Sequence, residues 1–296
     1  MNGCDATGVQ WSAIFRFRMP RYRGPLLTRA SARALLAAQA SGAGEWIGSL
    51  DLGHGTGTAL LHADAWEWNG QAYPWPGPVR ERDIAWWDGD SFATIARYSG
   101  RLIKLVPTRW GPPTFEIDGI KMLPTATTSP LDDAQRKVAL VAPAGGRVLD
   151  TCGGLGYFAA SCLRAGAAHV LSFEKDADVL WLRTLNPWSP DPVAHADRFE
   201  LRHADATTAI ATMADASVDA LLHDPPRFGI AGELYSLAFY IELARVLRRG
   251  GRLFHYTGRP NQRSHGRDLP GEVARRLERA GFTATPALDG VLARRR

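Results

Sequence analysis

Short apolar runs alternate with longer amphipathic segments in the second half of the chain. From Arg147 onward, the apolar runs have strand length, whereas the segments between them repeat apolar residues at a spacing of three or four. This alternation predicts an α/β fold, a doubly wound sheet of parallel strands joined by helices. The expected strands are 147–149, 169–173, 199–203, 218–223 and 252–257, and the expected helices are 157–164, 177–186, 206–214, 235–247 and 271–280.

Strands dominate the pattern in the first half. Alternating apolar and polar residues are punctuated there by Gly, Pro and Asp-Gly pairs, as in β-rich domains. We expect a β-rich N-terminal domain, with a disordered leader before Met19. One helix is expected over 31–39, and the expected strands are 46–52, 59–68, 92–98, 101–107 and 114–120.

A linker of small residues, Thr125 to Pro130, separates the two patterns. Ser129 as an N-cap, proline at the first helical position and Asp132 three residues after the cap predict that a helix begins here. The domain boundary is therefore expected near this linker, with the β-rich domain over 1–128 and the α/β domain over 129–296.

The stretch with the clearest chemistry is Asp150-Thr-Cys-Gly-Gly-Leu-Gly156. An expected strand runs into it and an expected helix leaves it, which is the strand, glycine turn and helix of a nucleotide site. Glycines let the backbone turn tightly and approach a ligand closely. Glu174 follows at the end of the next strand, where a ribose hydroxyl pair would be bound. We infer that the ligand is S-adenosylmethionine.

A second glycine-rich stretch, Asp51-Leu-Gly-His-Gly-Thr-Gly57, matches the glycine consensus better, because Cys152 replaces a glycine in the later copy. The residues after it, 59–70, favour a strand that ends at an Asn-Gly turn and not the helix that a nucleotide site needs. We therefore expect the first copy to be a turn between two strands, in which glycines supply positive φ.

An acidic residue stands at or just after the end of each of the first four expected α/β strands: Asp150, Glu174, Asp205 and Asp224. Ligands of doubly wound sheets bind at this edge. We expect Glu174 at the ribose, Asp205 and the following amides at the adenine amine, and Asp150 at the methionine amino group. Simpler roles stay open, in which Asp150 orients the glycine loop, Glu174 pairs with Lys175 and Asp205 caps the next helix.

The fourth strand leads into His223-Asp-Pro-Pro-Arg227. Paired prolines fix φ and leave carbonyl groups without neighbouring amide hydrogens, so this edge can hold an amine or amide nitrogen beside a sulfonium methyl group. An ordinary rigid turn is the alternative interpretation.

From about residue 112 to 290 the chain resembles class I S-adenosylmethionine-dependent methyltransferases, with Asp150 to Gly156 as the cofactor loop and Asp224 to Arg227 as the acceptor-side motif. Strings that begin at Pro113, Asn186 and Ala231 resemble an uncharacterised group of predicted archaeal methyltransferases. The resemblance implies a Rossmann-like methyltransferase sheet and the cofactor more firmly than any acceptor. The expected cofactor-binding residues are Asp150, Cys152, Gly154, Gly156, Glu174, Lys175, Asp205, Ala206 and Asp224.

Methyl transfer depends mainly on in-line positioning and a dry pocket, so few groups need to act as a base. We expect Asp224, His223 and His255 to be catalytic, with a packing role as the alternative for the two histidines. Tyr235 and Tyr240 lie five residues apart, so at most one of them should line the pocket. The expected substrate-binding residues are Pro225, Pro226, Arg227, Glu233, Tyr235 and Tyr256.

Composition adds limits to these expectations. The formal net charge is +5 and the sequence pI about 9.3, but the 35 basic residues are spread along the chain, which is weak evidence for a nucleic-acid partner. Cys4, Cys152 and Cys162 form no disulfide or zinc pattern, and we expect no metal. No apolar stretch is long enough to span a membrane and no signal-peptide core is evident, so a cytoplasmic location is expected.

Three functions remain open. The first is a methyltransferase acting on a small molecule or a nucleobase, with a small molecule as the favoured partner. The second is an enzyme that transfers or cyclises the aminopropyl or aminocarboxypropyl arm of the same cofactor. The third is a non-catalytic module whose β domain binds RNA. Four costly carboxylates at strand ends argue against the third.

Overall fold

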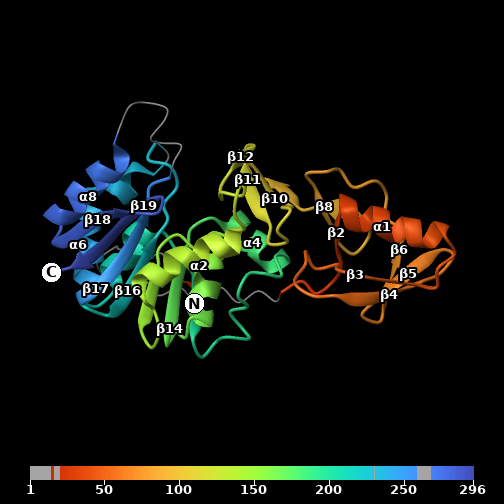
Figure 1. Ribbon diagram of the computed structural model, residues 1–296, viewed down its shortest axis with the longest axis horizontal. Helices are drawn as coiled ribbons and strands as arrows, with labels where there is room; N and C mark the ends of the chain where they lie inside the picture. The colour runs from red at the N-terminus through yellow and green to blue at the C-terminus, as the bar shows by residue number, and fades with distance from the viewer. Residues whose placement is uncertain (1–14, 17–20, 230, 259–267) are drawn as a thin grey trace, which may run out of the picture.

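An eight-stranded sheet forms the centre of the C-terminal part of the chain (Figure 1). The computed structural model describes residues 15–16, 21–229, 231–258 and 268–296. The strand order is β1-β15-β14-β13-β16-β17-β19-β18, and the strands from β15 to β17 run parallel, whereas β18 and β19 run antiparallel. The sheet strands are β1 (Phe15–Arg16), β13 (Arg147–Asp150), β14 (His169–Glu174), β15 (Phe199–His203), β16 (Val218–His223), β17 (Leu247–Tyr256), β18 (Phe282–Ala287) and β19 (Gly290–Arg295).

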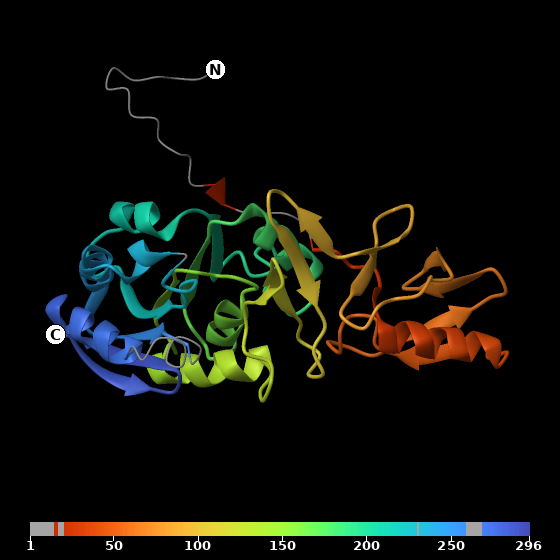
Figure 2. The same cartoon turned by 90° about the horizontal axis from the view of Figure 1, so that it is seen from above.

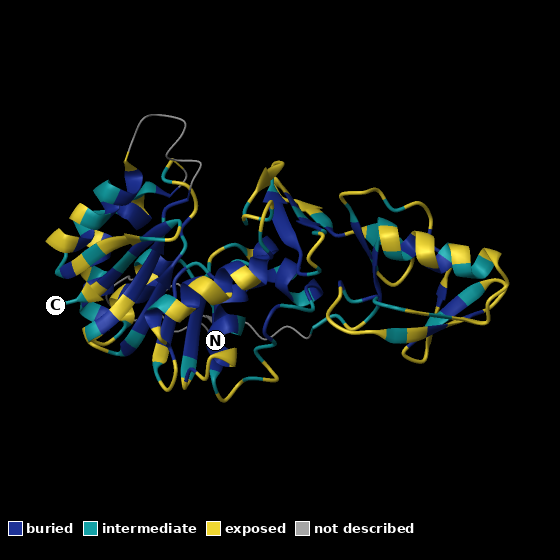
Figure 3. Ribbon diagram, viewed as in Figure 1, coloured by how far each residue is buried: buried dark blue, intermediate teal, exposed yellow. Residues whose placement is uncertain are grey.

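Helices cover both faces of this sheet, as expected for a doubly wound fold. Successive residues of β13 point to opposite faces, so Val148 packs into one buried cluster and Leu149 into the other. Figure 3 shows the buried strands between helices whose outer faces are exposed. The first cluster includes α2 (Pro130–Val141), α3 (Tyr157–Arg164) and α4 (Ala177–Leu185), and the second includes α5 (Ala206–Ala209), α6 (Leu237–Val246) and α8 (Leu269–Arg279). The predicted α/β doubly wound, Rossmann-like fold is confirmed.

The chain order of the strands reverses between β13 and β16, which lie side by side at the centre of the sheet. Such a switch point opens a crevice at the carboxyl ends of the strands. Helix α2 begins where the sequence predicted, because the Ser129 hydroxyl accepts the Asp132 amide hydrogen at 3.0 Å.

The N-terminal part is built from small antiparallel sheets (Figure 2). Its buried core is rich in aromatic side chains. Trp66, Trp68 and Tyr73 are buried against helix α1 (Arg29–Ala40). The sheets are β3 (Glu45–Gly48), β4 (Gly57–Leu61), β5 (Ala65–Trp68) and β6 (Gln71–Pro74); β2 (Leu26–Thr28), β7 (Ile84–Trp87) and β8 (Phe92–Thr94); and β9 (Ala96–Tyr98), β10 (Leu102–Val106), β11 (Thr114–Ile117) and β12 (Ile120–Lys121).

Several predicted boundaries are wrong. The strand expected over 59–68 is two strands, β4 and β5, and the predicted Asn-Gly turn follows β5 with positive φ at Asn69 and Gly70. The strand expected over 92–98 is divided into β8 and β9. Strands β18 and β19 were not predicted. The leader expected before Met19 lies outside the described residues, apart from the two residues of β1.

Candidate active site

The glycine loop between β13 and α3 lies at the switch point. Gly154 and Gly156 have positive φ of 48° and 84°, a conformation that glycine adopts at low cost. The Gly154 amide donates to Glu174 Oε2 at 2.8 Å, and the Gly156 amide donates to the Gly153 carbonyl oxygen at 2.7 Å. The loop is therefore held both by its own turn and by the acidic residue at the end of β14.

Arg183 of α4 fills the space behind this loop. A Cβ atom at Gly153 would lie 2.8 Å from Arg183 Nη1, and one at Gly156 would lie 2.5 Å from Arg183 Nη2. The arginine is 4% exposed, and burial lowers its pKa to about 10 against the opposing effect of Asp150 and Glu174. These two glycines are therefore required for the close approach of a buried cation as well as for the turn.

Asp150 is fully buried at the end of β13. Its Oδ2 accepts the Ser172 hydroxyl at 2.9 Å, whereas its Oδ1 has no hydrogen-bond partner among the described residues. Burial raises the pKa of Asp150 to about 6, although Ser172 and Arg183 act in the opposite direction. A buried carboxylate oxygen without a donor is costly, so this edge of the site can accept a cation or a donor.

Glu174 accepts two backbone amides, from Gly154 and, at 2.8 Å, from Asp176. Burial raises its pKa, and both amides oppose that shift. Each carboxylate oxygen keeps a second lone pair, so hydroxyl donors can still bind it. The pairing with Lys175 that sequence left open is not observed in the described structure, because the Lys175 ammonium contacts Asp205.

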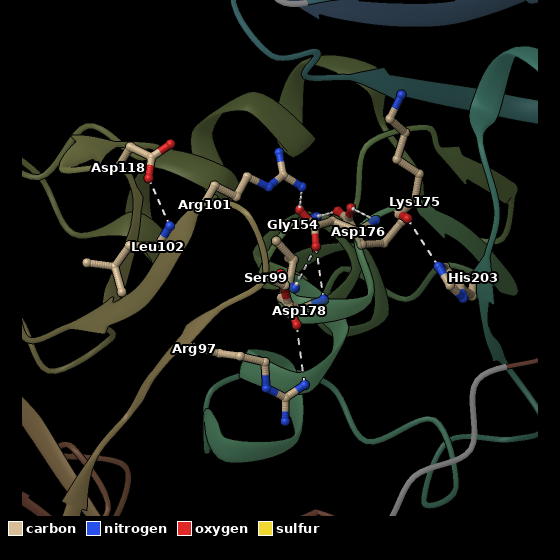
Figure 4. A network of polar contacts seen from close by, with 12 residues as sticks. Arg97, Ser99, Arg101, Leu102, Asp118, Gly154, Lys175, Asp176, Asp178 and His203 are labelled. Carbon is tan, nitrogen blue, oxygen red and sulfur yellow. Dashed lines mark hydrogen bonds and ion pairs between the residues drawn. The ribbon is translucent and has the colours of Figure 1, made fainter.

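The hairpin formed by β9 and β10 reaches the start of α4, where Arg97, Ser99 and Arg101 meet Asp176 and Asp178 (Figure 4). Arg101 forms an ion pair with Asp176, and Arg97 forms one with Asp178 at 3.3 Å. Ser99 also donates to Asp178. The sequence did not predict these contacts, because the partners come from segments nearly 80 residues apart.

Asp205 caps helix α5, as its simpler interpretation predicted. It accepts the Thr207 amide at 2.9 Å and the Lys175 ammonium at 3.2 Å. Burial opposes ionisation, but these donors outweigh it and lower the pKa of Asp205. The side chain is 38% exposed, so it can accept further donors from a ligand beside the amides around Ala206.

Asp224 follows β16 on the other side of the switch point. No hydrogen-bond donor reaches its carboxylate within the described ranges. Burial raises its pKa to about 7, Lys137 acts to lower it, and Asp133, Asp289 and Asp150 raise it further. Asp224 is thus a half-buried carboxylate whose ionisation depends on charges from other elements.

The two prolines after Asp224 have different environments. Pro225 is buried and Pro226 is exposed, and the Pro226 carbonyl accepts the Tyr235 hydroxyl at 3.0 Å. Arg227 and Glu233 are exposed. The structure therefore places Tyr235 against Pro226, two residues after Asp224.

His223 is fully buried and its two ring nitrogens are engaged. Nε2 lies 3.0 Å from the Leu234 carbonyl, to which it must donate, and Nδ1 lies 2.6 Å from the Thr151 hydroxyl. Burial lowers the pKa of His223 to about 4. The ring is thus a neutral link between the glycine loop and the segment after the acceptor motif.

His255 has the same character on β17. Its Nδ1 lies 2.8 Å from the Tyr256 carbonyl and its Nε2 lies 2.7 Å from the hydroxyl of Tyr240, which is itself fully buried. Burial and the neighbouring His223 ring lower the pKa of His255 well below its usual value. Both histidines have the features of the packing role that sequence left open.

A buried lysine lies behind the acceptor motif and was not predicted. Lys137 of α2 is 1% exposed and its ammonium lies 2.5 Å from Asp133 Oδ2, 3.3 Å from Asp289 Oδ2 and 4.2 Å from the centre of the Tyr256 ring. Asp133 and Lys137 stand four residues apart on one helix, which was the only available sequence signal. Asp289 lies in the turn between β18 and β19 and is too remote in sequence to be anticipated.

Cys152 replaces a loop glycine without preventing the turn. Its thiol is partly exposed, and burial together with the nearby carboxylates raises its pKa. Within the described ranges, no group of three or more His, Cys, Asp or Glu residues can hold a metal ion. The described helices also include none that is long and apolar enough to cross a membrane.

The first glycine stretch lies between β3 and β4, as predicted, but only one of its three glycines supplies the expected positive φ. Positive φ occurs at Leu52 and Gly53, and not at Gly55 or Gly57. Asp51 Oδ1 accepts the Gly55 amide at 2.9 Å, which closes the turn. In the same loop, the Leu52 carbonyl accepts the Trp188 indole hydrogen at 3.0 Å, so the loop is hydrogen-bonded to the segment after α4.

No family model matches the chain. The spermidine synthase in complex with the transition-state analogue AdoDATO shares 17% identity with a TM-score of 0.52, over 67% of this chain and 70% of that one. The spermidine synthase of Thermotoga maritima shares 13% identity with a TM-score of 0.51, over 84% of this chain and 78% of that one. At these identities the likeness establishes the fold.

A curated relative is much closer in sequence. It is "Uncharacterized protein MJ1233" of Methanocaldococcus jannaschii, which is 42% identical over 206 residues, or 69% of each chain. The chain therefore belongs to the family of this uncharacterized archaeal protein.

Proposed function

We propose that this protein is an S-adenosylmethionine-dependent methyltransferase acting on a small molecule or a nucleobase. The observation that carries the proposal is the meeting of four carboxylates and a glycine turn at one switch point. Asp150, Glu174 and Asp205 lie on the side of the glycine loop, and Asp224 lies across from them after β16. Such a set of hydrogen-bond acceptors can bind ribose hydroxyls, an adenine amine and a positively charged group, which are the features of a nucleoside that carries a sulfonium charge.

The residues present fit this cofactor. Glu174 retains lone pairs for two ribose hydroxyls, and Asp205 with the amide of Ala206 offers an acceptor and a donor to an adenine edge. The orphaned Asp150 Oδ1 offers an acceptor to an ammonium group or to a water bound to it. When bound, the cofactor supplies an electrophilic methyl group. We assign its binding to Asp150, Cys152, Gly154, Gly156, Glu174, Lys175, Asp205, Ala206 and Asp224.

The acceptor would be held on the opposite side of the switch point. The Asp224 carboxylate and the rigid Pro225-Pro226 edge would orient a nucleophile and accept its proton or hydrogen bond. His223 and His255 would not touch the acceptor, because their ring nitrogens already have hydrogen-bond partners. His223 contacts Leu234 and Thr151. His255 contacts Tyr240 and Tyr256. We therefore assign catalysis to Asp224 and positioning to the two histidines. The acceptor pocket would be completed by Arg227, Glu233, Tyr235 and Tyr256.

Transfer of the aminopropyl or aminocarboxypropyl arm is the second candidate. One observation favours it, because Asp133 and Asp289 extend the carboxylate cluster at Asp224 that a polycationic amine would require. The ammonium of Lys137 already contacts both of these carboxylates, however. The charge of these carboxylates is therefore already balanced by a lysine of the chain itself, so the cluster is a poor site for a polycationic amine. This favours methyl transfer.

The test is to incubate the protein with S-adenosylmethionine and a metabolite extract and to follow both nucleoside products by chromatography. Methyl transfer gives S-adenosylhomocysteine, whereas transfer of the aminocarboxypropyl arm of the same cofactor gives methylthioadenosine. Transfer of the aminopropyl arm also gives methylthioadenosine, but from decarboxylated S-adenosylmethionine, which is supplied in a parallel incubation. We expect S-adenosylhomocysteine from the wild type and none from Asp224→Ala. Enzyme-dependent methylthioadenosine without S-adenosylhomocysteine would replace the proposal with the second candidate. Absence of cofactor binding to the folded protein would leave the non-catalytic RNA-binding module.

A further inference from the structure

Lys137 connects three elements at the back of the acceptor side. It belongs to α2, it contacts Asp289 in the turn between β18 and β19, and it lies over the ring of Tyr256 at the end of β17. Its remaining contact is Asp133, one turn earlier on its own helix. The side chain is thus fixed at both its helix and its ammonium end.

Burial of a lysine is unfavourable unless its charge is compensated. Burial acts to lower the pKa of Lys137, but Asp224, Asp133 and Asp289 together outweigh it and raise the pKa above its usual value. The lysine is therefore an ammonium ion at neutral pH. Because it is 1% exposed, water screens its field only weakly.

Asp224 depends on this field more than its neighbours do. Asp133 forms a direct ion pair with the lysine, and Asp150 accepts the Ser172 hydroxyl, whereas no donor within the described structure binds Asp224. Strands β16 and β17 pair His223 with His255, so Asp224 and Tyr256 follow directly on these neighbouring strands, and the Lys137 ammonium lies over that tyrosine ring. Within the described structure, Lys137 acts to lower the pKa of Asp224. Among the described residues, the titratable and charged groups around Asp224 are Lys137 and Asp133 of α2, Asp289 of the β18–β19 turn, Asp150 of β13, Cys152 of the glycine loop, Tyr235 of η2 (Gly232–Tyr235), Tyr256 of β17 and Arg227 beyond the prolines.

We propose that Lys137 is a positioning residue of the acceptor side, which favours the carboxylate form of Asp224 and fixes the Tyr256 ring beside it. The inference rests on the proposed function only in one respect, namely that Asp224 and the two prolines after it are taken to bind the acceptor. An ionised Asp224 accepts a hydrogen bond or a proton from a nucleophile, whereas a protonated one does not. Lys137 would thereby set the lower pH limit at which the site is active.

The titration of Asp224 can be followed without an acceptor, by NMR of protein carrying ¹³C-labelled aspartate, with the signal assigned through Asp224→Asn. Lys137→Met removes the cation at similar volume, and we expect the Asp224 midpoint to rise by about 1 to 3 pH units. Asp133→Asn removes a like charge and should lower the midpoint by about 0.5 to 1 unit. Lys104→Met is the matched control, since Lys104 forms an ion pair with Asp83 in the β-rich part.

Shifts of opposite sign in the Lys137 and Asp133 variants would support the inference, because a purely structural defect does not reverse its sign. An Asp224 midpoint unchanged in folded Lys137→Met would overturn it. If that variant does not fold, the Asp133→Asn shift decides, and its absence overturns the inference. Calorimetry with S-adenosylhomocysteine tests the proposed function separately. If the wild type does not bind this nucleoside, the cofactor assignment is wrong, but the Asp224 shifts still test the role of Lys137.

Discussion

The carboxylate of Glu174 accepts the amide hydrogen of Gly154 at 2.8 Å, which joins the end of β14 to the turn that leaves β13. The same carboxylate accepts the Asp176 amide at the start of α4. Asp176 in turn pairs with Arg101 of the β-rich part. Glu174 therefore connects the glycine loop to the start of α4, which the N-terminal part also contacts. It would both bind the ribose and hold the loop in place.

Replacing Glu174 should weaken cofactor binding. We expect Glu174→Ala to cost about 1 to 3 kcal/mol of S-adenosylmethionine binding, the usual penalty for loss of a charged acceptor. Glu174→Gln keeps one acceptor oxygen and should lose less. Isothermal titration calorimetry measures both affinities.

The matched control for Glu174 is Glu200→Gln on the neighbouring strand β15, where the carboxylate pairs with Arg202. This change should leave the affinity within experimental error. Equal losses in the Glu200 and Glu174 variants would show that general loosening of the sheet, and not ribose binding, explains the result.

Asp224 borders both the cofactor and the acceptor side, and it should matter far more for turnover than for cofactor affinity. We expect Asp224→Ala to reduce kcat by roughly 10² to 10⁴ with the acceptor supplied, because positioning and proton acceptance of this kind have effects of that size. Cofactor affinity should change by less than about tenfold. Steady-state kinetics and calorimetry on the same preparation separate the two quantities, and equal losses in both would assign Asp224 to the cofactor side.

Asp224 should also give stability a characteristic pH dependence. Its folded pKa of about 7 lies above the ordinary aspartate value, so its contribution to stability is full below about pH 4 and is lost as the pH rises through 7. Relative to wild type, Asp224→Asn should therefore gain on the order of 1 to 3 kcal/mol in unfolding free energy between pH 4 and pH 8. Urea titrations at both pH values measure this difference.

The control is Asp197→Asn, whose side chain is 74% exposed. It removes a carboxylate that is hydrated in both the folded and the unfolded protein. If the stability difference changes with pH equally for Asp224→Asn and Asp197→Asn, Asp224 is not desolvated in the folded protein.

Local pattern was enough to predict the strand, turn and helix around the glycine loop, and it did not reveal the contacts of Lys137. The stretch from β13 through Gly156 into α3 is contiguous, and its strand, turn and helix have separate local signals. The Lys137 cluster brings Asp289 to a helix about 150 residues earlier in the chain, and no local rule encodes that contact. Strand β19 was not predicted because its sequence ends in two arginines and does not look like a buried strand. Its Val291 and Ala293 are nevertheless buried.

The first glycine loop lies against the segment that contains Trp188, whose indole donates to the Leu52 carbonyl. A Cβ atom at Gly57 would lie 2.4 Å from Cη2 of Trp68, an indole only 7% exposed in the aromatic core of the β-rich part. Gly57→Ala must therefore displace a packed ring, and we expect it to cost about 1 to 3 kcal/mol of stability. Gly55→Ala should cost less, since its Cβ would meet only the Asp51 carboxylate at 3.1 Å.

Gly44→Ala is the control for this loop, because no atom lies within 4 Å of its added Cβ. Urea unfolding gives the three stabilities, and calorimetry gives the three cofactor affinities. We expect Gly57→Ala to lose stability while it keeps the wild-type affinity, because the cofactor would bind at the later loop, where Gly154 contacts Glu174. A folded Gly57→Ala protein with normal stability and no cofactor binding would instead assign the nucleotide to the first loop, since only a ligand contact would then remain to explain why glycine is needed there.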